Sequence, residues 1–256
     1  MQRYFVASAQ ISGQSATLEG DDARHLAQVM RAKPGDKIMI CDGSGREALA
    51  KLVTVDKDIV HAEIVEVHPA ESEMAWRVTV AQSLPKGDKL ETVIQKGTEA
   101  GAAAFLPFLS QRTVVQYDER KEAKRVDRWR KIAKEAAEQS HRGVVPEVMA
   151  VSSWKSLIGR FSEYDLVLLC YEEEGRAGNG LRRVLTEFAA RLADGGKPRI
   201  LIVVGPEGGF DEREAEAAAA AGANPIGLGK RILRTETAAL YALACIAYAS
   251  GELGGD

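Results

Sequence analysis

The sequence predicts an α/β domain that follows a smaller all-β domain. Within the first 70 residues, short strand patterns alternate with turn signals such as KPGD and DGSG. From residue 73 onward, apolar runs such as LVLLC and ILIVV alternate with amphipathic helical patterns, which is typical of a parallel sheet covered on both faces. The segment HPAESE separates the two patterns. We therefore expect one domain over residues 1–70 and a second over residues 73–256.

The first domain is expected to be a small β-barrel. Its predicted strands cover residues 3–7, 14–19, 37–43, 46–55 and 58–67. The segment DARHLAQVMRA predicts one helix among them, with Asp21 or Asp22 as the N-cap.

The second domain is expected to alternate strands with helices. The predicted strands cover residues 77–84, 103–109, 165–171, 199–205 and 225–228. The predicted helices cover residues 89–101, 180–193, 211–222 and 235–250, and a long charged segment covers 118–141. The longest apolar run, residues 238–249, is too short to span a bilayer and fits a buried helix.

Composition narrows the function classes. The chain has 256 residues, 34 of them basic and 37 acidic, for a net charge of −3. A protein that held nucleic acid by bulk charge would be strongly basic. Cys41, Cys170 and Cys245 lie far apart and predict neither a disulfide framework nor a metal pair, and the opening residues carry no apolar signal core. We expect a cytoplasmic protein without metal or membrane attachment.

Two glycine-rich turns follow predicted strands of the second domain. VVGPEGGF covers residues 203–210 and precedes a helix that begins at Asp211, while IGLGKRILRTETA covers 226–238, with Thr235 as a candidate N-cap. Ligands of open α/β sheets bind beyond the carboxyl ends of the strands, and glycine lets main-chain groups approach them closely. Neither turn has the pattern of a dinucleotide-binding or phosphate-binding loop. No nucleophile elbow or catalytic triad is evident.

The chain resembles the RsmE family of ribosomal RNA methyltransferases, which belong to the SPOUT class. The similarity rests on long motifs in the same order: HLAQVMRAKPGD, KLETVIQKGTEAG, RWRKIAKEAAEQSHR, GPEGGF and LGKRILRTETAAL. The resemblance implies a PUA-like barrel that binds RNA and a dimeric SPOUT domain with a carboxyl-terminal trefoil knot. It further implies methyl transfer from S-adenosylmethionine to N3 of a uridine in 16S ribosomal RNA of the small ribosomal subunit.

The candidate site residues follow from these motifs. The expected cofactor-binding residues are Leu169, Cys170, Tyr171, Gly205, Pro206, Glu207, Gly208, Gly209, Leu228, Gly229, Arg231, Ile232, Leu233 and Thr235. The expected RNA-binding residues are His25, Arg31, Arg112 and Arg142. Uridine N3 carries a proton, so the reaction needs a base and a cation beside the developing anion. Arg234 and Glu236 are the candidate catalytic residues, although Glu207 is a second candidate base and Arg231 a second candidate cation.

The carboxyl-terminal helix predicts a homodimer. Its sequence is apolar on most sides, so it needs cover on more than one face. We expect Tyr241, Leu243, Ile246 and Tyr248 to point in too many directions for one sheet to cover, and a second copy of the chain to cover the rest. Cover by the barrel domain or another helix is the alternative.

Two other functions remain open at this point. A non-catalytic RNA-binding or ribosome-assembly protein could keep the same fold, although intact glycine-rich motifs argue against lost chemistry. A small-molecule α/β enzyme would suit the acidic pI of about 5.9 but has no recognisable catalytic group.

Overall fold

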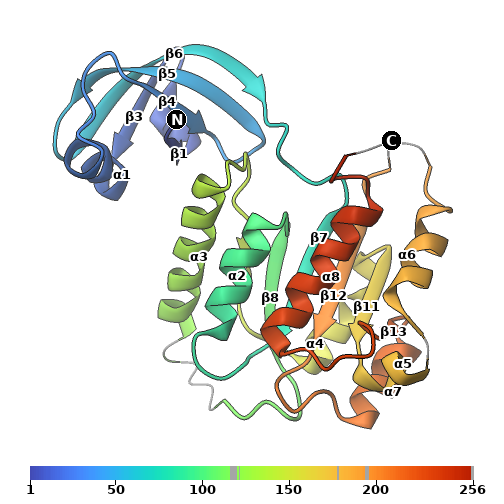
Figure 1. The fold of residues 1–256 in the computed structure, drawn as a ribbon. Helices are drawn as coiled ribbons and strands as arrows, with labels where there is room; N and C mark the ends of the chain where they lie inside the picture. The colour runs from blue at the N-terminus through green and yellow to red at the C-terminus, as the bar shows by residue number, and fades with distance from the viewer. Residues whose placement is uncertain (116–119, 121, 178, 194–195, 255–256) are drawn as a thin grey trace. The chain divides into compact units, whose positions relative to one another are not determined.

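The computed structural model describes residues 1–115, 120, 122–177, 179–193 and 196–254. The chain forms two compact units, Met1–Glu73 with Ala137–Val145, and Met74–Ala136 with Pro146–Asp256. Each unit has its own sheet (Figure 1). The expectation of two continuous domains did not foresee that residues 137–145 belong with the first unit. Residues 118, 119 and 121 of the predicted charged segment lie outside the described residues.

The first unit is a curled six-stranded sheet (Figure 1). Its strand order is β1 (Arg3–Phe5), β4 (Lys37–Cys41), β5 (Arg46–Val55), β6 (Ile59–Pro69), β3 (Ser15–Glu19) and β2 (Ile11–Ser12). Alternate residues such as Leu18, Ile40 and Leu52 are buried in its core, because successive side chains of a strand point to opposite faces. The predicted alternation of apolar and polar residues therefore places one face of the sheet inward.

The helix of this unit begins earlier than expected. Helix α1 covers Gly20–Arg24 and continues into a wider turn, η2, over His25–Val29. The N-cap position is Glu19, so the expectation of Asp21 or Asp22 there is wrong. Strand β3 runs to Glu19 and the chain turns at Gly20, where φ is +63°. Both aspartates already lie in the first turn, where carboxylates favour the helix dipole.

Buried ion pairs join residues 137–145 to the rest of this unit. The Arg142 side chain is 4% exposed and donates to the Glu73 carboxylate. Glu73 Oε1 also accepts hydrogen bonds from the amides of Gly143 and Val144, each at 3.1 Å. Arg3 donates to the Arg142 carbonyl oxygen at 3.1 Å and pairs with Glu47. Because Arg142 is enclosed in this way, we assign it a structural role instead of the expected contact with RNA.

The second unit contains a parallel sheet, as the sequence predicts. The strand order is β10 (Ser152–Ser153), β8 (Ala104–Leu109), β7 (Arg77–Ser83), β12 (Arg199–Val204), β11 (Leu166–Cys170) and β13 (Asn224–Ile226), and β9 (Glu147–Val148) pairs with β8. All these pairings are parallel. The carboxyl ends of the strands therefore meet at one edge of the sheet.

Helices cover both faces of this sheet. They are α2 (Lys89–Glu99), α3 (Glu122–Gln139), α4 (Trp154–Gly159), α5 (Glu172–Ala177), α6 (Leu181–Ala189), α7 (Glu212–Ala220) and α8 (Thr235–Ala249). Leu157 of α4 and Ala218 of α7 pack against Phe108 and Leu169 of the sheet. Helix α8 contacts β7 and β12 and lies beside α2 (Figure 1). None of the described helices has the length and apolar character that crossing a membrane requires.

The apolar helix α8 is covered largely by its own chain. Leu243 and Ile246 are fully buried within this unit, so the expectation that they need a second copy for cover is wrong. Tyr241 and Tyr248 remain 41% and 76% exposed. A helix that is apolar all round gives no sequence signal for which side faces its own sheet, and only the structure separates these four residues.

We expect Glu73→Ala to destabilise the full chain by about 2 to 3 kcal/mol, because the buried Arg142 guanidinium and two amides lose their shared acceptor. Urea unfolding measures the change in free energy of unfolding. The control is Glu71→Ala, which removes an exposed carboxylate from the same segment and should change stability by less than about 0.5 kcal/mol. Equal effects of the two substitutions would show that the Glu73 pair contributes no net stability.

Candidate functional site

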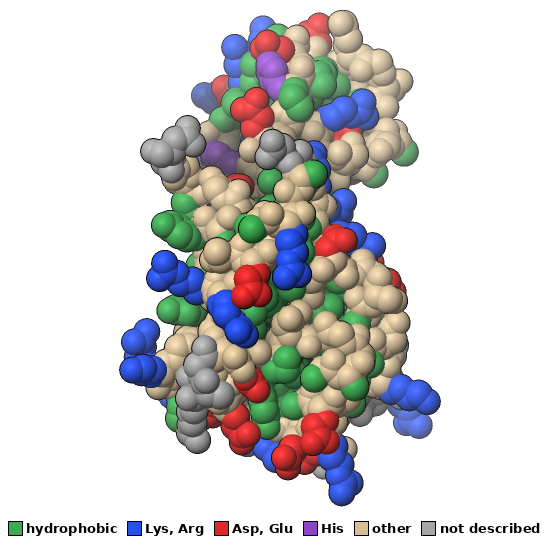
Figure 2. Space-filling view, turned by 90° about the vertical axis from the view of Figure 1, so that its right-hand side faces the viewer, with side chains coloured by type: hydrophobic (Ala, Val, Ile, Leu, Met, Phe, Trp, Pro, Cys, Tyr) green, Lys and Arg blue, Asp and Glu red, His purple; other side chains and the backbone are tan. Residues whose placement is uncertain are grey.

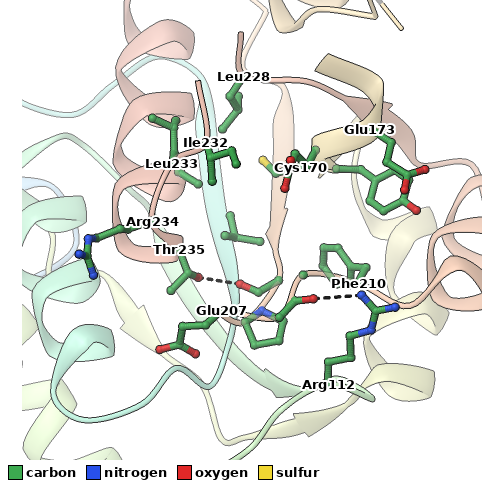
Figure 3. Close-up of a pocket in the computed structure, with 18 of the residues that line it drawn as sticks. Arg112, Cys170, Glu173, Glu207, Phe210, Leu228, Ile232, Leu233, Arg234 and Thr235 are labelled. Carbon is green, nitrogen blue, oxygen red and sulfur yellow. Dashed lines mark hydrogen bonds between the residues drawn. The ribbon is translucent and has the colours of Figure 1, made fainter. Parts of the chain in front are cut away.

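A cavity of about 800 Å³ opens at the carboxyl edge of the parallel sheet (Figure 3). Four stretches of chain supply most of its lining: the end of β11, the turn after β12, the turn after β13, and the first residues of α8. These stretches are far apart in the sequence and meet because parallel strands end together. Ligands of open α/β sheets bind in this position.

The turn after β12 needs its first glycine for packing. A Cβ atom on Gly205 would lie 3.2 Å from the Phe210 ring and 3.3 Å from the backbone carbon of Gly209. Gly209 has a φ of +66°, which favours glycine. Asp211 then caps α7, accepting from the amide of Arg213, and Glu214 completes a capping box. The expected helix start at Asp211 is therefore confirmed, and the turn presents its main chain to the cavity.

The turn after β13 presents apolar side chains. Gly229 has a φ of +99°, so this position favours glycine. The cavity is lined by Leu228, which precedes this glycine, and by Ile232 and Leu233, which follow it (Figure 3). Ile232 is 76% exposed, which leaves a large apolar side chain uncovered beside the cavity. Such a surface suits the flat apolar part of a ligand.

A buried chain of hydrogen bonds joins the two turns. The Thr235 hydroxyl donates to the Gly205 carbonyl oxygen at 2.6 Å and accepts from Nε2 of Gln82 at 2.8 Å. Gln82 is 1% exposed and is the penultimate residue of strand β7. Thr235 is therefore not the N-cap of α8, as the sequence suggested; Arg234 holds that position because the threonine hydroxyl is engaged with the neighbouring turn. Sequence analysis missed Gln82, although it lies at a strand end.

Charged groups gather at one end of the cavity. Glu207 accepts from Nζ of Lys89 at 2.7 Å and from the amide of Lys86 at 3.0 Å. Glu236 Oε2 lies 3.8 Å from the same Nζ. Partial burial alone would raise the pKa of the Glu207 carboxyl, but its hydrogen bonds from Lys89 and the main chain outweigh burial and lower that pKa. Glu207 is thus a stable anion that ties the turn to the start of α2.

Arg112 and Tyr171 also line the cavity, and Arg112 lies apart from Glu207 (Figure 3). The Arg112 guanidinium donates to the Gly208 carbonyl oxygen at 3.1 Å and lies 3.8 Å from Asp211 Oδ2, while half of the side chain stays exposed. Burial and the nearby Glu173 carboxylate raise the pKa of the Tyr171 hydroxyl. Burial raises the pKa of the neighbouring Cys170 thiol to about 12, so this cysteine stays protonated at neutral pH and is no nucleophile.

The structure brings most of the predicted site residues together. Every expected cofactor-binding residue except Leu169 lines the cavity; Leu169 is fully buried in the sheet. Arg234 lines the cavity, whereas Glu236 is not among the lining residues and has a buried carboxylate oxygen. His25 and Arg31 belong to the first unit, where both are exposed. Among the described residues, no group of histidine, cysteine or carboxylate side chains is placed to hold a metal ion.

Sequence analysis missed several lining residues. These are Lys89, Glu172, Glu173, Val204, Phe210, Glu212, Ile226 and Ala238. Val204, Phe210, Ile226 and Ala238 lie within the two glycine-rich motifs but were not singled out as site residues. Glu172, Glu173 and Glu212 lie within three positions of residues that were. Lys89 comes from a different element, the start of the helix after β7. The rule that ligands bind beyond strand ends applies to β7 as well and could have found it.

Comparisons with known proteins agree with this architecture. Residues 72–247 match the RNA methyltransferase domain family, and residues 18–65 match the RNA methyltransferase PUA domain family. The ribosomal RNA small subunit methyltransferase E of Bacillus subtilis is 44% identical over 260 residues, covering all of both chains. The corresponding Synechocystis protein is 36% identical and covers 95% of this chain and 76% of its own length.

Solved structures show the same fold. A ribosomal RNA small subunit methyltransferase E from Neisseria gonorrhoeae, crystallised with S-adenosylmethionine, matches with a TM-score of 0.83 and 31% identity. The match covers 97% of each chain. Two domain families in the right order and a relative of 44% identity over the full length leave one conclusion: the chain belongs to the ribosomal RNA small subunit methyltransferase E family.

Proposed function

We propose that this protein transfers the methyl group of S-adenosylmethionine to N3 of a uridine in the 16S ribosomal RNA of the small subunit. The observation that carries the proposal is the cavity between the two glycine-rich turns, in a chain that matches a relative crystallised with S-adenosylmethionine over 97% of its length. A ribosomal substrate implies action in the cytoplasm. A formed cavity with its motifs in place disfavours a protein that keeps only RNA binding.

The residues of the cavity fit S-adenosylmethionine. The exposed main chain at 207–209 offers hydrogen bonds to an adenine edge, and Leu228 and Ile232 offer apolar contact to its faces. Exposed carboxylates at Glu172 and Glu173 suit the positive charges of the ligand. When bound, S-adenosylmethionine supplies an electrophilic methyl group.

The two candidate catalytic residues have separate roles in this proposal. Arg234 lines the cavity and would stabilise negative charge on the uracil oxygens. Glu236 would accept the N3 proton. Its Oε2 atom is buried and has no hydrogen-bond partner among the described residues, so this oxygen can still accept a proton. Glu207 is less suited as the base, because its pKa is lowered and its Oε1 atom already accepts two hydrogen bonds.

RNA would be held by exposed groups of both units. His25 and Arg31 are exposed around η2, and Arg31 has a φ of +52°, an uncommon conformation for arginine. Its guanidinium and the exposed half of Arg112 suit phosphate oxygens. Local groups of this kind are compatible with a net charge of −3.

We also propose that the second unit contains a trefoil knot. Strand β13 lies outside β11, whereas α8, which follows it, packs on β12 and β7. Between them, Gly227 donates to the Asn179 carbonyl oxygen at 2.8 Å and accepts from the Leu181 amide at 3.3 Å. This pairing favours passage of the carboxyl-terminal segment through the connection that follows β11.

We also propose a homodimer, on the basis of the residues of α8 that remain exposed and no longer of Leu243 and Ile246. Tyr241 and Tyr248 of α8 and Leu253 after it are exposed, and an aromatic surface of this kind is typical of protein interfaces.

Because Leu243 is buried in its own chain, we use Tyr248→Arg as the test of the dimer. Light scattering should show a dimer for the wild type and a shift toward monomer for the variant. A monomeric wild type at micromolar concentration contradicts the proposal.

Gly208→Val should weaken S-adenosylmethionine binding by about tenfold or more, because the added side chain enters the space where main chain meets the ligand. The fold should persist, since a Cβ atom at this position meets nothing closer than 3.4 Å. Calorimetry measures the affinity, with Gly159→Val on the exposed surface of α4 as the control. Wild-type affinity in the Gly208 variant would remove the turn from the binding site.

Arg234→Ala should lower kcat by about a hundredfold while S-adenosylmethionine affinity changes by less than about threefold. This separation is expected if the guanidinium acts on the uracil and not on the cofactor. Single-turnover methylation and calorimetry give the two values, and Arg234→Lys should keep part of the rate. A parallel loss of cofactor affinity would instead place Arg234 in the cofactor pocket.

A further inference from the structure

Lys89 lies between two carboxylates, those of Glu207 and Glu236, and lines the cavity. Glu207 lies at the same end of the cavity as Arg234 (Figure 3). The three members of this cluster come from different elements: Lys89 begins α2, Glu207 lies in the turn after β12, and Glu236 lies in the first turn of α8. The Nζ atom of Lys89 is 2.7 Å from Glu207 Oε1 and 3.8 Å from Glu236 Oε2. None of the catalytic roles assigned above uses this lysine.

The lysine has hydrogen-bonding capacity to spare. An ammonium group has three N–H donors. Among the described residues, only Glu207 accepts from Lys89, because the 3.8 Å separation from Glu236 is too long for a hydrogen bond. The side chain is 29% exposed and lines the cavity. Two donors are therefore available to a molecule in the cavity, while the bond to Glu207 keeps the ammonium in place.

The charge around Lys89 indicates what that molecule is. The two carboxylates beside Lys89 repel a phosphate group that would approach its ammonium, and Arg234 at the same end brings the four side chains to no net charge. The exposed guanidinium of Arg112 suits a phosphate better, because Asp211 is the one carboxylate within ion-pairing distance of it among the described residues. A neutral group with carbonyl oxygens meets no such repulsion at Lys89. Uracil has two carbonyl oxygens, and they flank the nitrogen that would be methylated.

We propose that Lys89 is a catalytic residue that donates a hydrogen bond to a uracil carbonyl oxygen and stabilises the negative charge that spreads there as N3 loses its proton. This inference rests on the proposed function. The N3–H bond breaks and its proton passes to a base, for which Glu236 is the candidate. The N3 electron pair then forms the bond to the methyl carbon, and the pair of the broken S–CH₃ bond returns to sulfur. Lys89 keeps its own proton throughout.

The test compares Lys89→Met with Lys89→Arg in single-turnover methylation of small-subunit RNA across pH. Lys89→Met should lower the rate at neutral pH by about a hundredfold or more. Its rate should also go on rising to higher pH than that of the wild type, because an unassisted uracil ionises only at more alkaline pH. Lys89→Arg should recover part of the rate. Lys96→Met, an exposed lysine of the same helix that pairs with Glu99, is the matched control.

Two further measurements separate the alternatives. Calorimetry with S-adenosylmethionine should give the same affinity for Lys89→Met and the wild type within about threefold, and thermal unfolding should show an intact fold. A fall in cofactor affinity equal to the loss of rate would make Lys89 a tether for the turns and overturn the proposal. A rise in KM for RNA with an unchanged pH profile would make it a backbone contact, with the same consequence. A wild-type protein that methylates no uridine overturns the proposed function itself.

Discussion

The Thr235 hydroxyl makes the contact on which the rest of the site depends. It donates to the carbonyl oxygen of Gly205 and accepts from Gln82, so the ends of β7 and β12 and the first residue of α8 are held by one buried group. The reverse orientation of the Gln82 amide would set its oxygen against the carbonyl oxygens of Ser83 and Gly205, which the network disfavours. The two glycine-rich turns therefore keep a fixed separation, and the cavity lies between them.

The charged groups around the cavity divide by function because their partners differ. Glu207 is engaged by Lys89 and the main chain and behaves as a structural anion, whereas the buried oxygen of Glu236 has no hydrogen-bond partner among the described residues. Satisfied polar groups hold turns in place, and the unsatisfied acceptor is the group proposed above to take the N3 proton. The hydrogen bonds that fix the turns thus engage Glu207 and leave Glu236 as the proposed base.

Local patterns in the sequence predicted the main strands and turns well but carry no information on the order of the strands in the sheet. Strand β11 forms from the buried run LVLLC, and the turn at 205–209 forms around its glycines. Both depend on neighbouring residues in the sequence, so the sequence alone indicates them. The assignment of residues 137–145 to the first unit depends on Arg142 meeting Glu73, 69 positions away, and no periodicity marks a tertiary ion pair. Leu243 was misplaced because α8 is apolar on every side. Lys89 was missed because the expected cofactor-binding residues were taken only from the end of β11 and the segments that follow β11, β12 and β13.

The central claim is that the protein methylates uridine N3 of small-subunit ribosomal RNA from S-adenosylmethionine. The direct measurement incubates the full chain with unmethylated small subunits and methyl-labelled S-adenosylmethionine, digests the RNA to nucleosides, and separates them by mass spectrometry. We expect the label in 3-methyluridine, at about one per subunit when the reaction is complete. Label in any other nucleoside, or none in the RNA while S-adenosylmethionine binds the protein, contradicts the account.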